Sequence, residues 1–256
     1  MKTKKVGIKS NTKRSLVKQL KENMSIYWHH KLSRSWAACN FIRNMDIKCN
    51  TAPVTGRGIE SYKKHLFMDQ ANVFKYLKNK SYLDVGCGIN HLYKNALLYK
   101  LIKKGYKAKG LDLYKFPNNS NNDKHFVSRS IKQTKLPSNS FNVITSQYFL
   151  YYWMDNPKDL LETFKELNRI LRARGEVRIY PVYYGNFHYN DDMLLNYLLK
   201  HFDIEVLKPK FVKEKVAYIY PGENIKDLKV TDNSVPTKEA EDAKTLEASL
   251  VIFKKK

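Results

Sequence analysis

The feature that most constrains the fold of this sequence is an alternation of short β-type runs with helical periodicity between residues 81 and 182. Five runs read as buried strands: SYLDV (81–85), KAKGLDL (107–113), HFVSR (125–129), FNVITS (141–146) and EVRIYPV (176–182). Helical patterns lie between them, one from Leu92 to Ile102 and one over 157–173. This alternation predicts an α/β fold with a parallel, doubly wound sheet.

The flanking regions have a different character. A helix is expected over 191–202, followed by strands at 203–207, 216–220 and 248–254, with a polar stretch at 222–245 that we expect to be a mobile loop. Before the alternating region we expect a basic flexible arm (1–25) and an aromatic-rich helical extension (26–80), whose best helix candidate is Ile59–Leu77. Residues 81–256 form the expected main domain.

The first strand runs into a turn, Gly86-Cys87-Gly88, that lies where open α/β sheets bind ligands. A dinucleotide site needs a third glycine for close helix packing, and His91 stands at that position. Asp84 precedes the turn, where its charge would repel a phosphate. These residues favour a ligand that bears an ammonium group and no phosphate, such as S-adenosylmethionine (SAM).

Four segments recur in an order that resembles a known family: LDVGCG (83–88), GLDL (110–113), LPSNSFNVITSQYFLYYW (136–153) and LETFKELNRILRARGEVRIYPV (161–182). Together they resemble the class I SAM-dependent methyltransferases of the type 11 group. The resemblance implies a Rossmann-like, mostly parallel seven-stranded sheet with helices on both faces. It also implies SAM as cofactor and S-adenosylhomocysteine (SAH) as its product.

The resemblance carries over to individual positions. Gly86 and Gly88 would hold the methionine moiety near Asp84, and Asp112 would bind both ribose hydroxyls. The remaining cofactor-binding candidates are the neighbours of these motifs: Cys87, Leu113, Ile131 and Ser146. The chain departs from the family before Leu136-Pro137, where relatives place an acid on the adenine and this sequence has Lys132 and Lys135.

The catalytic candidates follow the fourth and fifth strands. Aromatic residues and a histidine stand there, and among them we expect Tyr148 to line the acceptor site and His188 to act as a general base. A Tyr148 or His188 with a purely structural role is the alternative. No Asn-Pro-Pro-Tyr motif and no Pro-Cys pair occurs, which disfavours two routes of DNA-base methylation. No metal site is expected.

The net charge of +23 is unevenly distributed. Residues 1–35 hold ten Lys and Arg against one acid, Glu22, whereas residues 183–256 carry twelve charges of each sign. A basic N-terminal half makes RNA or another polyanion a candidate partner. Three cysteines without metal spacing and no long apolar run indicate a cytoplasmic protein with no membrane span, with a Lys-rich transit peptide as the alternative.

The function expected from these features is methyl transfer to an O or N nucleophile. RNA, a small molecule and a protein all remain open as acceptors, and the sequence does not indicate an oligomeric state. An inactive SAM-fold module that binds nucleic acid is the alternative from a different class. Residues 26–58 interleave aromatic and basic side chains and are expected to form a lid that closes over the cleft.

Overall fold

The structure is a computed structural model that describes residues 54–113, 124–147, 157–182, 192–207, 215–219, 229–232 and 249–256. The basic arm, most of the expected lid, Tyr148 and His188 lie outside these residues. Within the described residues no helix is long and apolar enough to span a membrane. The same residues contain no group of three or more His, Cys, Asp or Glu that could hold a metal ion.

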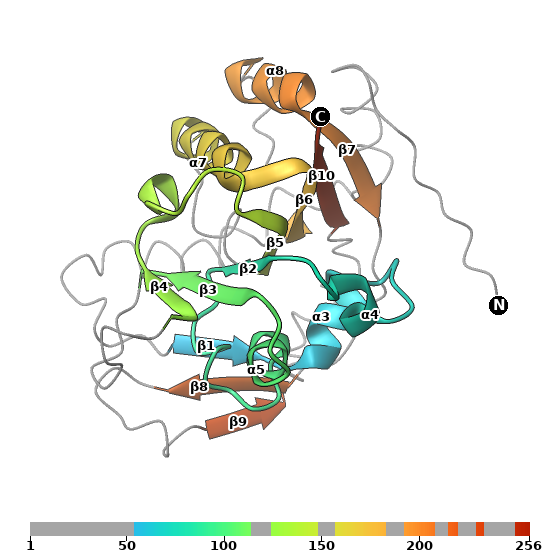
Figure 1. The fold of residues 1–256 in the computed structure, drawn as a ribbon, viewed down its shortest axis with the longest axis vertical. Helices are drawn as coiled ribbons and strands as arrows, with labels where there is room; N and C mark the ends of the chain where they lie inside the picture. Colours follow the sequence, from blue (N-terminus) through green and yellow to red (C-terminus); the bar gives the residue numbers. More distant parts are fainter. Residues whose placement is uncertain are drawn as a thin grey trace, which may run out of the picture.

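The main sheet confirms the predicted doubly wound arrangement (Figure 1). Its seven strands follow the order β4-β3-β2-β5-β6-β10-β7. The strands are β2 (Tyr82–Val85), β3 (Ala108–Asp112), β4 (Phe126–Ser128), β5 (Phe141–Gln147), β6 (Leu171–Val182), β7 (Phe202–Leu207) and β10 (Ser249–Lys255). The first five in chain order, β2 to β6, pair in parallel, while β10 runs antiparallel to β6 and β7. The chain winds outward from β2 to β4 and then returns to β5 on the other side of β2, so the switch point lies between β2 and β5.

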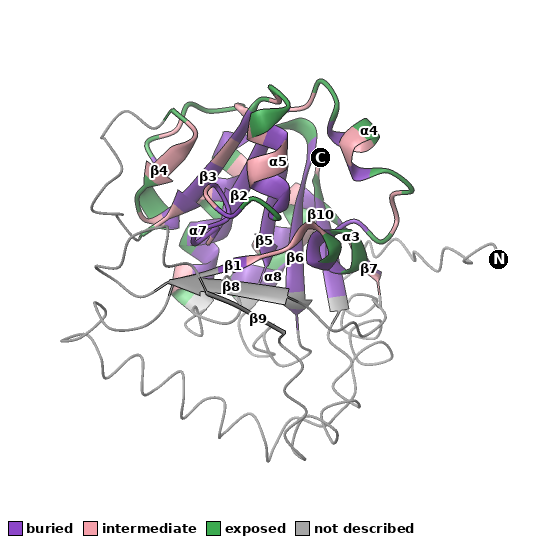
Figure 2. Cartoon of the chain, turned by 90° about the horizontal axis from the view of Figure 1, so that it is seen from below, coloured by how far each residue is buried: buried purple, intermediate pink, exposed green. Residues whose placement is uncertain are grey.

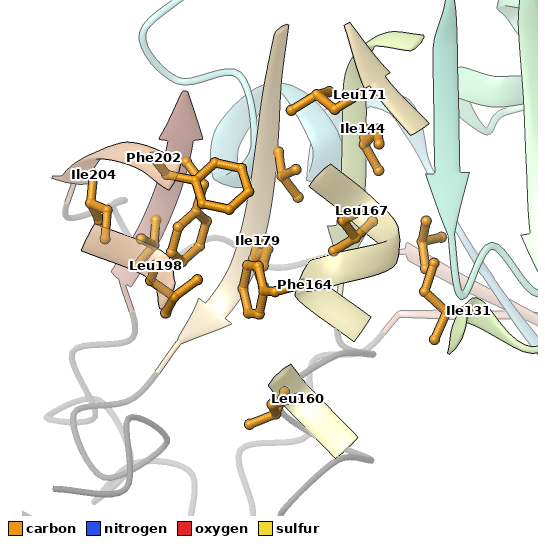
Figure 3. Close-up of a cluster of buried hydrophobic side chains, with 14 of the residues drawn as sticks. Ile131, Ile144, Leu160, Phe164, Leu167, Leu171, Ile179, Leu198, Phe202 and Ile204 are labelled. Atoms are coloured by element: carbon orange, nitrogen blue, oxygen red, sulfur yellow. The ribbon is translucent and has the colours of Figure 1, made fainter. Parts of the chain in front are cut away.

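Helices cover both faces of this sheet because successive strand residues point to opposite sides. On one face α7 (Pro157–Ile170), α8 (Asp192–His201) and the 3₁₀ turn η1 (Ile131–Gln133) pack over a core that includes Phe164, Phe202 and Phe253 (Figure 3). On the other face, α3 (Ile59–His65), α4 (Val73–Leu77) and α5 (Leu97–Lys103) bury a second cluster. The central strands β2 and β5 are almost wholly buried, whereas β4 at the edge of the sheet is partly exposed (Figure 2).

Two predicted helices have different bounds in the structure. The helix expected from Leu92 begins only at Leu97. The residues before it form turns, in which the backbone amides of Leu92 and Tyr93 both donate hydrogen bonds to the Ile89 carbonyl at 2.9 Å. The helix expected to reach residue 173 ends at Ile170, whose carbonyl accepts a bond from Ser140 N. Strand β6 begins at once with Leu171, which pairs with Phe141.

The N-terminal extension is not purely helical. Strand β1 (Val54–Arg57) pairs antiparallel with β8 (Lys215–Ile219), which in turn pairs with β9 (Lys229–Asp232). We call these three strands the accessory sheet. Strand β9 lies inside the polar stretch that the sequence suggested was a loop, and β8 joins this second sheet instead of the main one. Pairing of distant segments, which the local pattern does not encode, accounts for both differences.

A buried ion cluster fixes the extension to the main sheet. The helix expected over Ile59–Leu77 is broken between α3 and α4, and Asp69 in the break pairs with Arg178 of β6 at 2.6 Å. The Arg178 guanidinium also bonds the Leu66 carbonyl at 2.7 Å and the Glu176 carboxylate, and it lies over the rings of Phe67 and Tyr76. Because Arg178 is only 1% exposed, each of these partners compensates for its lost hydration.

We therefore predict that Arg178→Met lowers the free energy of unfolding by about 3–5 kcal/mol, because it leaves the buried Glu176 and the partly buried Asp69 without their cation. Urea denaturation measures this loss. The control is Lys254→Met, which removes the half-exposed pair between Lys254 and Glu205 on β10 and β7 and should cost less than about 1 kcal/mol. Equal losses in the two variants would contradict the assignment of Arg178 as the anchor of the extension.

Candidate functional site

The glycine turn follows β2 at the switch point of the main sheet. Gly86 and Gly88 have φ angles of 67° and 48°, a region that L side chains rarely adopt. The backbone amides of Gly86 and Cys87 both donate to the Leu111 carbonyl of β3, at 2.8 and 3.2 Å. The turn is thus tied to the neighbouring strand and presents backbone without side chains at both glycine positions.

Asp112 stands at the carboxyl end of β3, next to this turn. Its Oδ2 accepts a hydrogen bond from Gly88 N at 2.8 Å, and the residue is partly exposed. The two family positions that the sequence placed in different motifs therefore meet in the structure. A carboxylate oxygen can accept more than one hydrogen bond, so the bond to Gly88 leaves Asp112 able to receive hydroxyl groups of a ligand.

Cys87 points away from the ligand side and packs beneath the turn. A Cβ atom on Gly110 would lie 2.6 Å from Cys87 Sγ and 2.9 Å from Leu98 Cδ2, so a glycine is needed on β3 at this point. The thiol is 1% exposed, and burial raises its pKa well above the ordinary value. A buried, protonated thiol is a poor nucleophile, so the contacts of the Cys87 side chain support a packing role.

Asp84 lies under the turn as the centre of a buried hydrogen-bond network. Its Oδ2 accepts from Tyr62 Oη of α3 at 2.6 Å and from Asn90 Nδ2 at 3.0 Å, and its Oδ1 accepts from Thr145 Oγ1 of β5 at 2.9 Å. Burial raises the pKa of Asp84 to about 6, although the three donors oppose this by favouring the ionised form. The carboxylate is 1% exposed and joins three parts of the chain.

Asn90 connects this network to the accessory sheet. Its side-chain oxygen accepts from Arg57 N of β1 at 2.7 Å, while its Nδ2 also approaches Tyr62 Oη at 2.6 Å. A Cβ atom on Gly56 would lie 2.7 Å from Ile89 Cγ1, so β1 passes directly against the glycine turn. The N-terminal extension therefore forms part of the site itself.

The other predicted cofactor-binding residues are placed differently. Ser146 is buried at the end of β5, paired with Val85 of β2. Leu113 follows Asp112 and is 67% exposed. Ile131 belongs to η1 and packs into the hydrophobic core on the α7 face (Figure 3). Nothing can be said of the placement of Tyr148 and His188, which lie outside the described residues.

Sequence reasoning missed the polar residues that surround the predicted ones: Ser61, Tyr62, His65, Asn90, Thr145 and Gln147. Thr145 and Gln147 carried a usable signal, because alternation along β5 puts both on the same sheet face as Asp84. Ser61, Tyr62 and His65 share one helix face, but only the tertiary structure shows which strands that face contacts.

Part of the chain matches a known protein family. Residues 83–179 match the family described as a methyltransferase domain. A comparison with curated protein sequences finds no match.

Several solved structures are similar to the chain. One is a SAM-dependent methyltransferase from Archaeoglobus fulgidus, with 15% identity over 77% of this chain and 98% of that chain and a TM-score of 0.41. Another is the N-methyltransferase NodS from Bradyrhizobium japonicum in complex with SAH, with 12% identity, coverages of 74% and 91% and a TM-score of 0.38. Such low values say nothing about substrate. The glycine turn, Asp112 and strands β3 to β5 all lie within residues 83–179, the part of the chain that matches this family.

Proposed function

We propose that this domain binds SAM at the carboxyl ends of β2 and β3 and transfers its methyl group to a nitrogen or oxygen nucleophile. The observation that carries the proposal is the contact between Gly88 N and Asp112 Oδ2, 2.8 Å long, at the switch point of the sheet. It brings a turn of bare backbone and a partly exposed carboxylate to one place, which suits a ligand with an apolar chain and a ribose.

The residues present fit SAM better than a dinucleotide. His91 takes the third glycine position of the dinucleotide motif; it is buried and stacks on Phe126 with ring centroids 4.3 Å apart. A pyrophosphate would also lie close to Asp84 and Asp112, and the repulsion would oppose its binding. The same two carboxylates favour a ligand with a positive charge and free hydroxyl groups.

The chain's own residues would act mainly by positioning. SAM supplies a methyl group on a sulfonium, which is already a good leaving group. Asp112 would orient the ribose, and the turn at Gly86 and Gly88 would let the methionine chain approach the backbone. Holding an acceptor in line with the methyl can supply about 7–11 kcal/mol of the barrier reduction. His188 and Tyr148 remain the proposed base and acceptor-site residue.

We predict that Asp112→Ala weakens SAM binding about ten- to a hundred-fold, because charge-assisted hydrogen bonds to the ribose are lost. Isothermal titration calorimetry measures the change. The control is Asp159→Ala, which removes an exposed carboxylate on α7 paired with Lys132 and should bind SAM like the wild type. Unchanged affinity in Asp112→Ala, or binding of NADH without SAM, would refute the proposal.

Asp84 gives the site a predictable pH dependence. Its pKa in the free protein is about 6, and a bound cation would favour the ionised carboxylate and lower that pKa. SAM affinity should therefore be full above about pH 7 and fall as the pH drops through 6 toward 5. Tyr62→Phe removes a donor that stabilises the ionised form, so the midpoint should move to higher pH. An affinity that does not change between pH 5 and 7 would show that Asp84 is not coupled to the ligand.

We further propose that RNA contacts the sheet face covered by α3, α4 and α5. Eight exposed lysines lie on or beside these helices: Lys63, Lys64, Lys75, Lys78, Lys94, Lys103, Lys104 and Lys107. Residues 57–109 contain only three acids, Glu60, Asp69 and Asp84. Glu60 pairs with Lys63, Asp69 pairs with Arg178, and Asp84 is buried, so these acids neutralise little of the lysine charge.

Binding of a fluorescent single-stranded RNA should weaken steeply with salt, because each neutralised phosphate releases counterions. The triple variant Lys103→Glu, Lys104→Glu, Lys107→Glu should reduce the slope of log K against log salt by up to about 2. The matched control replaces Lys158, Lys165 and Lys200, which lie on the opposite face, with Glu. Deleting residues 1–25 should also flatten the slope. Undetectable binding, or equal effects of the two triple variants, would contradict the RNA proposal and favour a small molecule or a protein as the methyl acceptor.

A further inference from the structure

Gln147 ends β5 at the switch point, beside the glycine turn. Strand β5 pairs with β2 so that Ser146 lies opposite Val85, and Gln147 is therefore level with the start of the turn at Gly86. On its other side Gln147 pairs with Tyr180 of β6. Its side chain lies on the same sheet face as Asp84, because alternate residues of β5 share a face.

Helix α3 of the N-terminal extension contacts the Gln147 side chain. Gln147 Nε2 lies 2.6 Å from Ser61 Oγ and 3.2 Å from His65 Nδ1, both on α3. The imidazole of His65 stacks on the Tyr180 ring, with centroids 4.2 Å apart and an interplanar angle of 10°. One edge of the Gln147 amide is thus fixed by a helix that the family model does not include.

The carbonyl oxygen on the other edge of the amide lacks a hydrogen-bond donor among the described residues. Gln147 is 6% exposed, and among the described residues its Oε1 is buried with no hydrogen-bond partner. A buried carbonyl oxygen without a donor is costly, and native structures rarely keep one without a functional reason. The position at the switch point suggests that a donor arrives with the substrates.

We propose that Gln147, fixed by Ser61 and His65, is the residue that positions the methyl acceptor, and that the acceptor is a nitrogen bearing a hydrogen. This inference rests on the proposed function. The N–H group would donate to Gln147 Oε1, and this bond would turn the nitrogen lone pair toward the methyl group. Ser61 of α3 and Tyr180 of β6, on the same sheet face as the Gln147 side chain, carry uncharged hydroxyl groups, which suit a neutral amine or ring nitrogen better than a carboxylate.

The fate of the acceptor's proton favours a nitrogen acceptor over a hydroxyl acceptor. A neutral nitrogen attacks with its lone pair: the N–C bond forms, the C–S bond breaks with its electrons on sulfur, and the extra proton leaves the product nitrogen for water. A hydroxyl would need to lose its proton during attack. If the hydroxyl donated its hydrogen bond to Gln147 Oε1, the proton could not be transferred there, because an amide oxygen is too weakly basic to accept it.

An SAH analogue whose sulfur is replaced by a carbon bearing an aminomethyl arm tests this arrangement without an identified acceptor, because its methylene stands where SAM carries the methyl group and its amine stands where the acceptor nitrogen would lie. We expect Gln147→Met to weaken binding of this analogue about tenfold while SAH affinity stays within about twofold of the wild type. Asn168→Leu is the matched control. It removes another amide whose buried oxygen has no partner among the described residues, on α7 beside Tyr197, and should change neither affinity.

The ratio of the two affinities separates the possible outcomes. An unchanged ratio in a Gln147→Met protein that still binds SAH would overturn the inference. Failure of the wild type to bind either ligand would instead refute SAM binding itself. Because Gln147→Met could fail to fold, the wild type should also be crystallised with the aminomethyl analogue. We expect its amino nitrogen within about 3.2 Å of Gln147 Oε1, and a separation above about 4.5 Å would exclude the contact.

Discussion

The site depends on one buried carboxylate. Asp84 accepts hydrogen bonds from α3, from the residue after the glycine turn and from β5, through Tyr62, Asn90 and Thr145. Desolvation makes an unsatisfied carboxylate costly, so each of these donors must stay in place for the charge to be tolerated. The result is that the N-terminal extension, the turn and the switch-point strands are held in one arrangement.

Through this network the extension becomes part of the candidate site. Gly56 and Arg57 of the accessory sheet touch the turn, Tyr62 reaches Asp84, and Ser61 and His65 reach the end of β5. Arg178 anchors the same extension further along β6 through Asp69. Under the proposed function, a segment added to the sheet, such as this extension, is expected to contribute to the choice of acceptor.

Local pattern was enough to predict the parallel part of the main sheet, and the family resemblance assigned Gly88 and Asp112 to one ligand. The two residues meet because strand order in a doubly wound fold brings successive carboxyl ends together. Local pattern was not enough for β9, which lay in a polar stretch, or for the break at Asp69, which depends on a partner more than a hundred residues away. The placement of Ile131 in the core also escaped prediction, since its burial is decided by packing under α7. Long-range pairing and packing are the terms that a sequence window omits.

The central claim is that the glycine turn and Asp112 form one ligand site for SAM. Amide NMR of the 15N-labelled wild type during titration with SAH tests it most directly. The account predicts saturable shifts of the amides of Gly86, Gly88 and Leu113, with the amides of α8 unmoved. Saturable shifts confined to other elements, or shifts of the turn produced by NADH and not by SAH, would contradict it.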